Sequence, residues 1–155
     1  MGQAMRYDII ADTHGYLSDE LLHALEGADV IVHAGDICSA GDLRRLEDIA
    51  SVKFCLGNND YGYDYGPFAK RDYRFYSSKL RWQVCHYRER LDLAVCDVAV
   101  CGHTHRPLVE RDKRYGTLVM NPGSPTHPRA SGPSMGRIMA EEGQVLSAEI
   151  IRLAS

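Results

Sequence analysis

Short apolar runs alternate with amphipathic segments along the first third of the chain. Three of the runs have the length and pattern of buried strands: residues 6–11, 29–34 and 51–56. Between them, apolar residues recur at three- to four-residue spacing and predict helices over 18–27 and 41–50. Ser18 is a suitable N-cap for the first helix and Gly27 a suitable stop. This alternation favours right-handed crossovers and a parallel sheet.

The second half of the chain follows a different pattern. Residues 57–70 contain three glycines, one proline and three tyrosines, which predicts a long ordered loop. Seven further strand-like runs follow: 73–77, 80–85, 95–101, 108–111, 117–120, 137–140 and 145–153. Tight turns such as Glu142-Gly143 indicate antiparallel pairing in this half. We therefore expect an α/β fold, a two-sheet β-sandwich flanked by helices, in one domain over residues 1–155, with a disordered leader at 1–5.

Composition and charge narrow the classes of partner. The 155 residues are 45% hydrophobic and 25% charged, as in a soluble globular protein. The formal net charge of -3 predicts no general attraction to long nucleic acid or to anionic membranes, although a local cationic site can still bind phosphate. No apolar run approaches the roughly 20 residues that span a bilayer. The N-terminus has no signal-peptide pattern.

Cysteine usage indicates a reducing compartment. The chain has five cysteines, an odd number, and no pair has CxxC spacing. Cys55, Cys85 and Cys101 end apolar stretches, where cysteine behaves as a small buried hydrophobe. A disulfide framework is therefore disfavoured, and we expect a cytoplasmic protein.

Five short polar segments each follow the end of a predicted strand. They are Asp12-Thr13-His14, Gly35-Asp36, Gly57-Asn58-Asn59-Asp60, His86, and Gly102-His103-Thr104-His105. Ligands of open α/β sheets bind at the carboxyl ends of strands, where such loops converge. Asp, His and Asn supply oxygen and nitrogen ligands that suit manganese, iron, zinc or magnesium. Because these segments hold no cysteine, a structural zinc site is disfavoured.

The spacing of these residues predicts more than one ion. In the pairs Asp12/His14 and His103/His105, alternate residues of an extended segment would point the same way. Seven to eight candidate ligands would over-supply one ion, whereas two ions with a shared carboxylate would use them. Asp36 is the expected bridge, because the preceding glycine lets the backbone bend close to the metals.

In this order, the segments resemble the calcineurin-like metallophosphoesterases, specifically their small bacterial and archaeal phosphodiesterase branch. The resemblance runs from Asp12 through Asn121-Pro122-Gly123-Ser124 to Arg129. It implies the αββα sandwich of that family and two divalent ions, with Mn²⁺ expected first and Fe, Zn, Ni or Mg as alternatives. It also implies two ligand sets: Asp12, His14, Asp36 and His105 for one ion, and Asp36, Asn58, His86 and His103 for the other.

The expected function is hydrolysis of a small phosphodiester by a metal-bridging hydroxide. The residues expected to act through this hydroxide are Asp36, Asn58, His86 and His103. The alternative is a catalytically inactive protein-interaction scaffold, a role that one retromer subunit of the family has. Complete ligand positions favour the enzyme. The acidic balance disfavours a nuclease on long nucleic acid, and homo-oligomers stay open.

Two departures from the family pattern bear on substrate binding. Asn59 replaces the histidine that protonates the leaving group in many relatives, and an amide cannot act as a general acid. The family's His-Gly-His reads His86-Tyr87-Arg88 here, so Arg88 can reach a phosphate or remain solvated. We count both Asn59 and Arg88 as candidate substrate contacts. The short gap from His86 to His103 leaves little room for the helix that relatives place there.

Neighbouring residues are expected to support the site. His33 should orient a loop or a ligand, and Asp60 should hydrogen-bond a ligand histidine without binding metal. His127 can lie at the rim of the pocket. Tyr61, Tyr63 and Tyr65 alternate along the predicted loop, where packing is favoured over stacking on a base.

Overall fold

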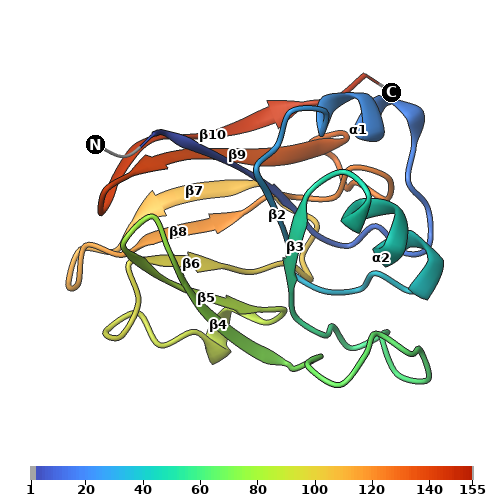
Figure 1. The fold of residues 1–155 in the computed structure, drawn as a ribbon, viewed down its shortest axis with the longest axis horizontal. Helices are drawn as coiled ribbons and strands as arrows, with labels where there is room; N and C mark the ends of the chain where they lie inside the picture. The colour runs from blue at the N-terminus through green and yellow to red at the C-terminus, as the bar shows by residue number, and fades with distance from the viewer. Residues whose placement is uncertain (1–2, 155) are drawn as a thin grey trace.

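Two five-stranded sheets pack face to face in the computed structural model, which describes residues 3–154 (Figure 1). The first sheet has the order β10-β9-β1-β2-β3, with β1 (Met5–Ile10), β2 (Val30–His33), β3 (Ser51–Phe54), β9 (Ser134–Glu141) and β10 (Gln144–Arg152). The second has the order β4-β5-β6-β8-β7, with β4 (Asp72–Ser77), β5 (Leu80–Cys85), β6 (Val98–Val100), β7 (Leu108–Arg111) and β8 (Leu118–Asn121). The predicted two-sheet sandwich is confirmed.

Strand pairing agrees with the sequence pattern in part. β1, β2 and β3 are parallel, as their alternation with helices predicted. The hairpins β4–β5 and β9–β10 and the pair β7–β8 are antiparallel, as the tight turns predicted. However, β5, β6 and β8 pair in parallel. Longer connections link these three strands, and sequence-adjacent turns therefore do not determine their direction.

The core between the sheets follows the two-residue period of the strands. Tyr7 and Ile9 point from β1 into this core, where the Tyr7 and Trp82 ring centroids are 4.4 Å apart. Ile10, one position along, points to the opposite face of the sheet. The first sheet is therefore buried on both faces.

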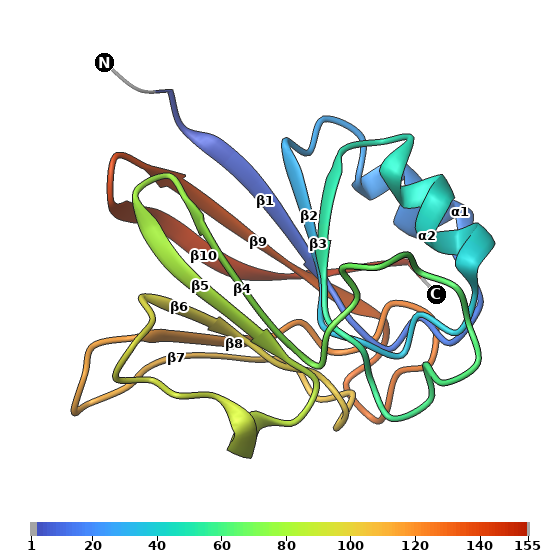
Figure 2. The same cartoon turned by 60° about the horizontal axis from the view of Figure 1, so that its bottom comes forward.

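Two short helices cover the outer face of the first sheet: α1 (Asp19–Ala24) and α2 (Ala40–Glu47) (Figure 2). Leu21 and Leu46 pack there in a cluster that includes Ile10. Each helix is capped by a serine, since Ser18 Oγ accepts the Leu21 N–H at 3.2 Å and Ser39 Oγ that of Asp42 at 3.1 Å. Both helices are shorter than the sequence predicted.

The outer face of the second sheet is covered differently. Within residues 3–154 its cover contains no α-helix; the β5–β6 connection carries only the 3₁₀ helix η1 (Arg88–Arg90). Leu91 and Leu93 from this connection pack against Cys96, Ala99 and Val119. The expected lack of room for an α-helix between His86 and His103 is thus confirmed, since the only helix there is η1. The α-helices flank the sandwich on one side.

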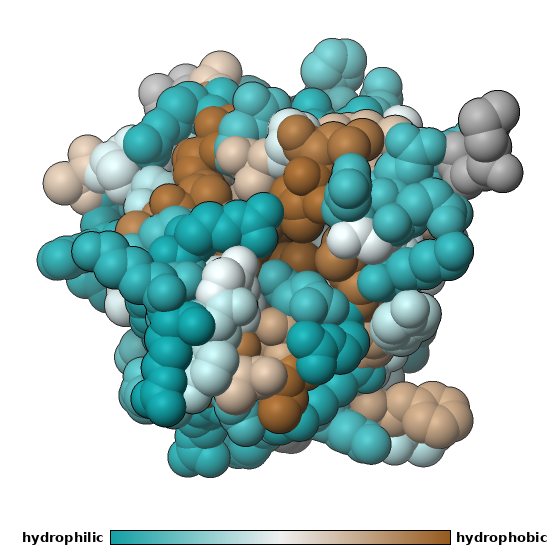
Figure 3. All heavy atoms as spheres, turned by 90° about the vertical axis from the view of Figure 1, so that its left-hand side faces the viewer, coloured by the Kyte–Doolittle hydropathy of each residue, from teal (hydrophilic) through white to brown (hydrophobic). Residues whose placement is uncertain are grey.

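Hairpin turns gather at one end of the molecule. The Gly143 N–H donates to the Ser78 carbonyl at 2.6 Å, and Lys79 pairs with Glu142 at 2.7 Å, so the turns of the two sheets are joined. Figure 3 shows this end, where hydrophilic and hydrophobic side chains are interspersed. The carboxyl ends of β1, β2, β3, β5 and β6 lie at the opposite end, and the loops after them form the candidate site.

Further sequence expectations concern the ends and the cysteines. Residues 1–2 of the expected leader lie outside the described residues, and Met5 already belongs to β1. All five cysteines are unpaired, and all except Cys38 are buried. No helix in residues 3–154 has the length and hydropathy required to cross a membrane.

Candidate metal centre

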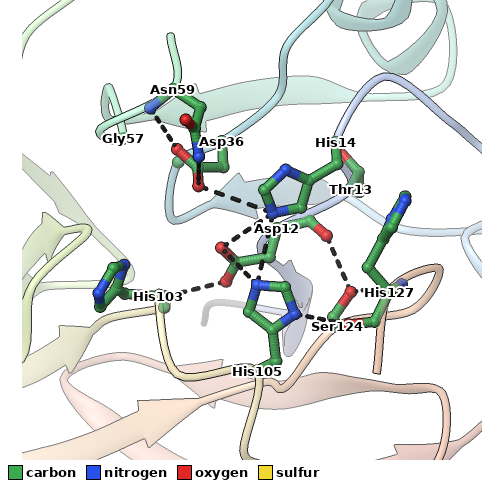
Figure 4. A network of polar contacts seen from close by, with 12 residues as sticks. Asp12, Thr13, His14, Asp36, Gly57, Asn59, His103, His105, Ser124 and His127 are labelled. Atoms are coloured by element: carbon green, nitrogen blue, oxygen red, sulfur yellow. Dashed lines mark hydrogen bonds and ion pairs between the residues drawn. The ribbon is translucent and has the colours of Figure 1, made fainter. Parts of the chain in front are cut away.

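Side chains from four loops meet at the carboxyl ends of the strands (Figure 4). Asp12 and His14 follow β1, Asp36 follows β2, His86 follows β5, and His105 precedes β7. Their ligand atoms form two groups, each with all atoms within 4.8 Å of one another: Asp12/His14/His105 and Asp12/Asp36/His86. The structure therefore brings together five of the seven residues predicted to bind metal.

Asp12 belongs to both groups, and Asp36 of the second group also faces His14 of the first. Asp36 Oδ2 lies 3.7 Å from His14 Nε2 and 3.4 Å from His86 Nε2. Asp12 Oδ1 lies 3.3 Å from His105 Nε2 and 3.7 Å from the Nε2 atoms of His14 and His86. Asp36 is therefore close enough to both groups to bridge two ions, as predicted from the sequence. Asp12 is also placed to bridge two ions, which the sequence did not suggest.

Hydrogen bonds orient the histidines toward the carboxylates. His86 Nδ1 lies 2.8 Å from the Ala34 carbonyl, and His105 Nδ1 contacts the His127 carbonyl. Because a carbonyl can only accept, both Nδ1 atoms carry a proton, and each Nε2 is directed at the carboxylates. Backbone partners of this kind orient metal-ligating histidines in general.

Two of the facing atoms lack hydrogen-bond partners. Asp12 Oδ1 and His86 Nε2 are buried and have no hydrogen-bond partner. The Nε2 atoms of His14 and His105 lie only 3.4 Å apart. Buried polar atoms without hydrogen-bond partners cost free energy. A cation among them would satisfy all of these atoms, so the donor set fits divalent metal.

Electrostatics agree with this arrangement. Burial acts to raise the pKa of Asp12, but contacts with His105 and His14 outweigh burial and hold this pKa well below its usual value. Burial also acts to raise the pKa of Asp36, but hydrogen bonds from His86 and the Asn59 N–H outweigh burial and lower this pKa. Both carboxylates are therefore anionic at neutral pH.

The candidate ligands sit on left-handed backbone. Nine non-glycine residues in 3–154 have positive φ, and five of them are predicted ligands: Asp12, His14, Asp36, His103 and His105. The expectation that the pairs Asp12/His14 and His103/His105 lie on extended segments is therefore wrong. Asp12 N–H donates to the Gly35 carbonyl at 2.9 Å and His14 N–H to that of Asp36 at 3.0 Å, which holds these turns. A positive φ strains the backbone of a non-glycine residue, and strained residues of this kind concentrate at functional sites.

Glycines permit the close approach of the loops. A Cβ on Gly57 would lie 2.1 Å from Asp36 Oδ1, and a Cβ on Gly35 would lie 2.8 Å from both Gly57 N and His86 Nδ1. No side chain fits at either position. Gly35 was predicted to let Asp36 approach the site, and Gly57 on the next loop is needed for the same close approach.

Asp60 organises the loops through backbone groups. Its Oδ2 accepts the N–H groups of Asp36 and Gly57, both at 2.7 Å, and its Oδ1 accepts those of Cys38 at 2.9 Å and the Tyr65 hydroxyl at 2.8 Å. The prediction of a bond to a ligand histidine is wrong. The carboxylate of Asp60 instead accepts from backbone N–H groups of the neighbouring loops, which need an acceptor because they are buried.

His33 also joins two loops. Its Nδ1 accepts the Gly35 N–H at 3.1 Å, and its Nε2 lies 2.9 Å from Thr13 Oγ1. Complete burial lowers the pKa of His33 to about 4. A neutral His33 therefore orients the loops, in agreement with the prediction.

The remaining predicted ligands lie at the exposed side. The His103 N–H donates to Asp12 Oδ2 at 2.9 Å, and its exposed ring has its centroid 5.1 Å from that of His86. The exposed Asn58 stands between Gly57 and Asn59. Asn59 donates to Asp36 from its backbone and from Nδ2, both at 2.9 Å. Metal binding by Asn58 and His103 stays a prediction.

Three other residues discussed in the sequence analysis, Arg88, Tyr65 and His127, lie in different environments. Arg88 pairs with Glu110 and lines a cavity of about 260 Å³ beside the His103 ring. A substrate contact would require Arg88 to leave that carboxylate. Tyr65 lies inside the 57–70 loop with its ring 5.8 Å from those of Phe54 and Tyr63, so Tyr65 is packed, as favoured. Tyr61 and Tyr63 are exposed, and the packing expected of them is therefore wrong. His127 borders the site, its ring centroid 5.1 Å from that of His14.

The Asn121-Pro122-Gly123-Ser124 segment braces the site, a role that sequence reasoning missed. Asn121 Nδ2 donates to the Gly102 carbonyl at 3.1 Å, and Ser124 Oγ donates to the Asp12 carbonyl at 2.8 Å. The signal was present, because this segment is part of the family resemblance.

Comparisons with known proteins agree with the fold and identify the family. The family model for the calcineurin-like phosphoesterase superfamily domain matches residues 5–143. A protein of Methanothermobacter thermautotrophicus named "Probable metallophosphoesterase" is 32% identical, with 96% of this chain and 92% of that protein covered.

Solved structures show the same fold at lower identity. A novel archaeal phosphodiesterase is 22% identical, with 95% of this chain and all of that chain (100%) covered and a TM-score of 0.72. Vacuolar Protein Sorting 29 from Cryptosporidium parvum is 17% identical, with 96% and 98% covered and a TM-score of 0.77. With the family model covering most of its length, this chain belongs to the calcineurin-like phosphoesterase superfamily.

Proposed function

We propose that this protein is a phosphodiesterase that depends on two divalent metal ions. One observation carries the proposal: Asp12 Oδ1 and His86 Nε2 are buried, lack partners and face each other at 3.7 Å. A fold that needed only stability would not retain this pair, because burying an unpartnered carboxylate oxygen costs free energy. A bound cation removes that cost.

The ligand sets follow the family resemblance. Asp12, His14, Asp36 and His105 would hold one ion, and Asp36, Asn58, His86 and His103 the other. When bound, paired divalent ions supply the positive charge that acidifies water and stabilises a phosphoryl transition state. We place Mn²⁺ first, with Fe, Zn, Ni and Mg as alternatives.

The chain's own groups set the geometry of the site. The Ala34 and His127 carbonyls hold His86 and His105 with Nε2 directed inward. Asn59 holds both carboxylate oxygens of Asp36 through its two N–H donors, which restricts the rotation of this side chain. A shared carboxylate held in one orientation favours two ions at a defined spacing.

The same Asn59 limits the choice of substrate. Its amide cannot donate a proton to a departing alkoxide. Esters whose leaving group departs as a stable anion are therefore favoured, such as activated phosphodiesters. We propose a small phosphodiester as the substrate, with Asn59 at its leaving-group side and Arg88 near its phosphate once released from Glu110.

The alternative function is an inactive protein-interaction scaffold of the same fold. A metal-free scaffold would have no use for two buried carboxylates and two inward-facing imidazoles, since their burial weakens the fold without metal. The five predicted ligands that lie together therefore favour the enzyme.

Hydrolysis of bis-p-nitrophenyl phosphate tests the proposal. Protein stripped of metal should be inactive, and manganese, nickel or magnesium should restore turnover, with little cleavage of p-nitrophenyl phosphate. Asp36→Asn should lose at least about 100-fold in kcat, because the carboxylate that faces both groups is neutralised. Asp97→Asn, whose carboxylate pairs with the exposed Arg81, is the matched control and should retain activity.

Two results would count against this proposal. Full activity of Asp36→Asn would exclude a bridging role for this carboxylate. Absence of hydrolysis with every metal, together with absence of tight metal binding, would favour the scaffold.

A further inference from the structure

A second cavity lies beside the candidate metal centre. Its volume is about 320 Å³, and its lining residues are Arg106, Pro107, Arg129, Ala130, Ser131 and Arg152. Arg106 precedes β7, Arg129 lies in the connection between β8 and β9, and Arg152 ends β10. Three arginines from distant parts of the sequence thus line one hollow.

The cavity is cationic. No carboxylate lines it, and among residues 3–154 no acidic side chain pairs with Arg106, Arg129 or Arg152 within 4.0 Å. Arg152 Nη1 donates to the Ser131 carbonyl at 3.0 Å, which holds this guanidinium at the wall. In a chain of net charge -3, three unpaired arginines at one cavity are a local reversal of sign. Guanidinium donors match phosphate oxygens in geometry and charge.

Two of the cavity's arginines are close in sequence to residues of the candidate metal centre. Arg106 directly follows His105, and Arg129 lies two residues after His127, whose carbonyl contacts His105 Nδ1. Both arginines are thus within two residues of groups that form or border the centre, and an anion in the cavity would lie beside a phosphodiester at the metals.

We propose that this arginine cavity binds a second phosphate group of the substrate. This proposal rests on the proposed function and adds the substrate class: small phosphodiesters that carry a further phosphate, such as nucleoside phosphodiesters with a phosphate on the other sugar hydroxyl. The metal centre takes the diester, and the arginine cavity takes the distal phosphate.

Ligand binding tests the cavity without requiring turnover. Thymidine 3′,5′-bisphosphate and thymidine 5′-monophosphate are titrated into the protein at fixed ionic strength, with manganese and again in chelator. The bisphosphate should bind at least about tenfold more tightly, and Arg129→Gln should remove most of this preference while leaving the monophosphate affinity unchanged. Arg106→Gln should act in the same direction. The matched control is Arg114→Gln, an exposed arginine in the β7–β8 loop.

Kinetics provide the second readout. The p-nitrophenyl ester of thymidine 5′-phosphate is compared with its 3′-phosphorylated form, and the 3′-phosphate should raise kcat/KM about tenfold in the wild type and little in Arg129→Gln. A binding preference without hydrolysis of either ester would refute the proposed function and retain the cavity. Equal binding of the two nucleotides, or equal weakening of both by Arg129→Gln, would overturn the cavity assignment.

Discussion

Asn59 is the residue whose identity most restricts the proposed chemistry. It donates two hydrogen bonds to Asp36 and has no proton to give a leaving group. Asn59→His should therefore raise hydrolysis of an alkyl phosphomonoester such as glycerol 2-phosphate by at least about tenfold, since general acid catalysis contributes roughly 10²–10⁴-fold. Phosphate release measures this gain. Asn59→Gln, which retains an amide, is the control, and a histidine variant that gains nothing would argue against the assigned position.

His33 makes stability depend on pH. Its pKa falls from 6.5 to about 4 on burial, so the unfolded chain binds this proton more readily than the folded chain. The free energy of unfolding therefore decreases as pH falls from about 6.5 to about 4, and the full contribution is present above that window. The loss is on the order of 3 kcal/mol.

The pH dependence is checked by denaturant unfolding across this window. His33→Gln should show a flatter slope than the wild type between pH 6.5 and 4, with both proteins in chelator because metal binding also varies with pH. Parallel curves for the two proteins would mean that His33 is not neutral when folded.

Residue types at the site were predictable, but their backbone was not. Oxygen and nitrogen ligands directly after predicted strands were sufficient to identify five candidate metal ligands that the structure brings together: Asp12, His14, Asp36, His86 and His105. Their left-handed φ angles and the acceptor role of Asp60 depend on hydrogen bonds between loops distant in sequence. Local spacing contains no information on which loops cross.

At the scale of elements, a buried ion cluster joins β1, β9 and α1. Asp8 is fully buried and accepts from Arg6 at 2.7 Å and Arg137 at 2.8 Å. Both arginines also donate to the carbonyl of Ala24, the last residue of α1. The cluster therefore holds the C-terminal end of α1 to the sheet.

Removal of the central charge should be costly. Asp8→Ala leaves two partly buried arginines without their carboxylate, and the free energy of unfolding should fall by about 2–4 kcal/mol. Chemical denaturation measures this value. Asp97→Ala, which breaks the exposed pair with Arg81, should cost less than about 1 kcal/mol, so similar losses in both variants would show that the cluster adds nothing.

Elements were predicted well where they are short and bounded by turn residues. β5 and β7 have the expected bounds of 80–85 and 108–111, because apolar alternation and flanking turns define them. The helices are shorter than their amphipathic patterns, and β9 is longer than its pattern, since pairing with both β1 and β10 extends it. The parallel pairing of β5, β6 and β8 required the tertiary structure, because long connections leave strand direction open.

At the scale of the whole molecule, the two sheets share one core. Side chains of both sheets form the main buried cluster, with Tyr7 from the first sheet against Trp82 from the second. We propose that residues 1–155 form a single domain that unfolds in one transition. The candidate centre lies at one end of this sandwich and takes ligands from both sheets, so metal binding should stabilise the whole domain rather than one loop.

Metal stoichiometry tests the central claim most directly. Mn²⁺ is titrated into chelator-treated protein by equilibrium dialysis, and bound metal is counted per chain. Two equivalents are predicted for the wild type, since Asp12 and Asp36 each face both groups of ligands, with weaker binding in Asp36→Asn. One equivalent would contradict the dinuclear site, and none would contradict the metalloenzyme itself.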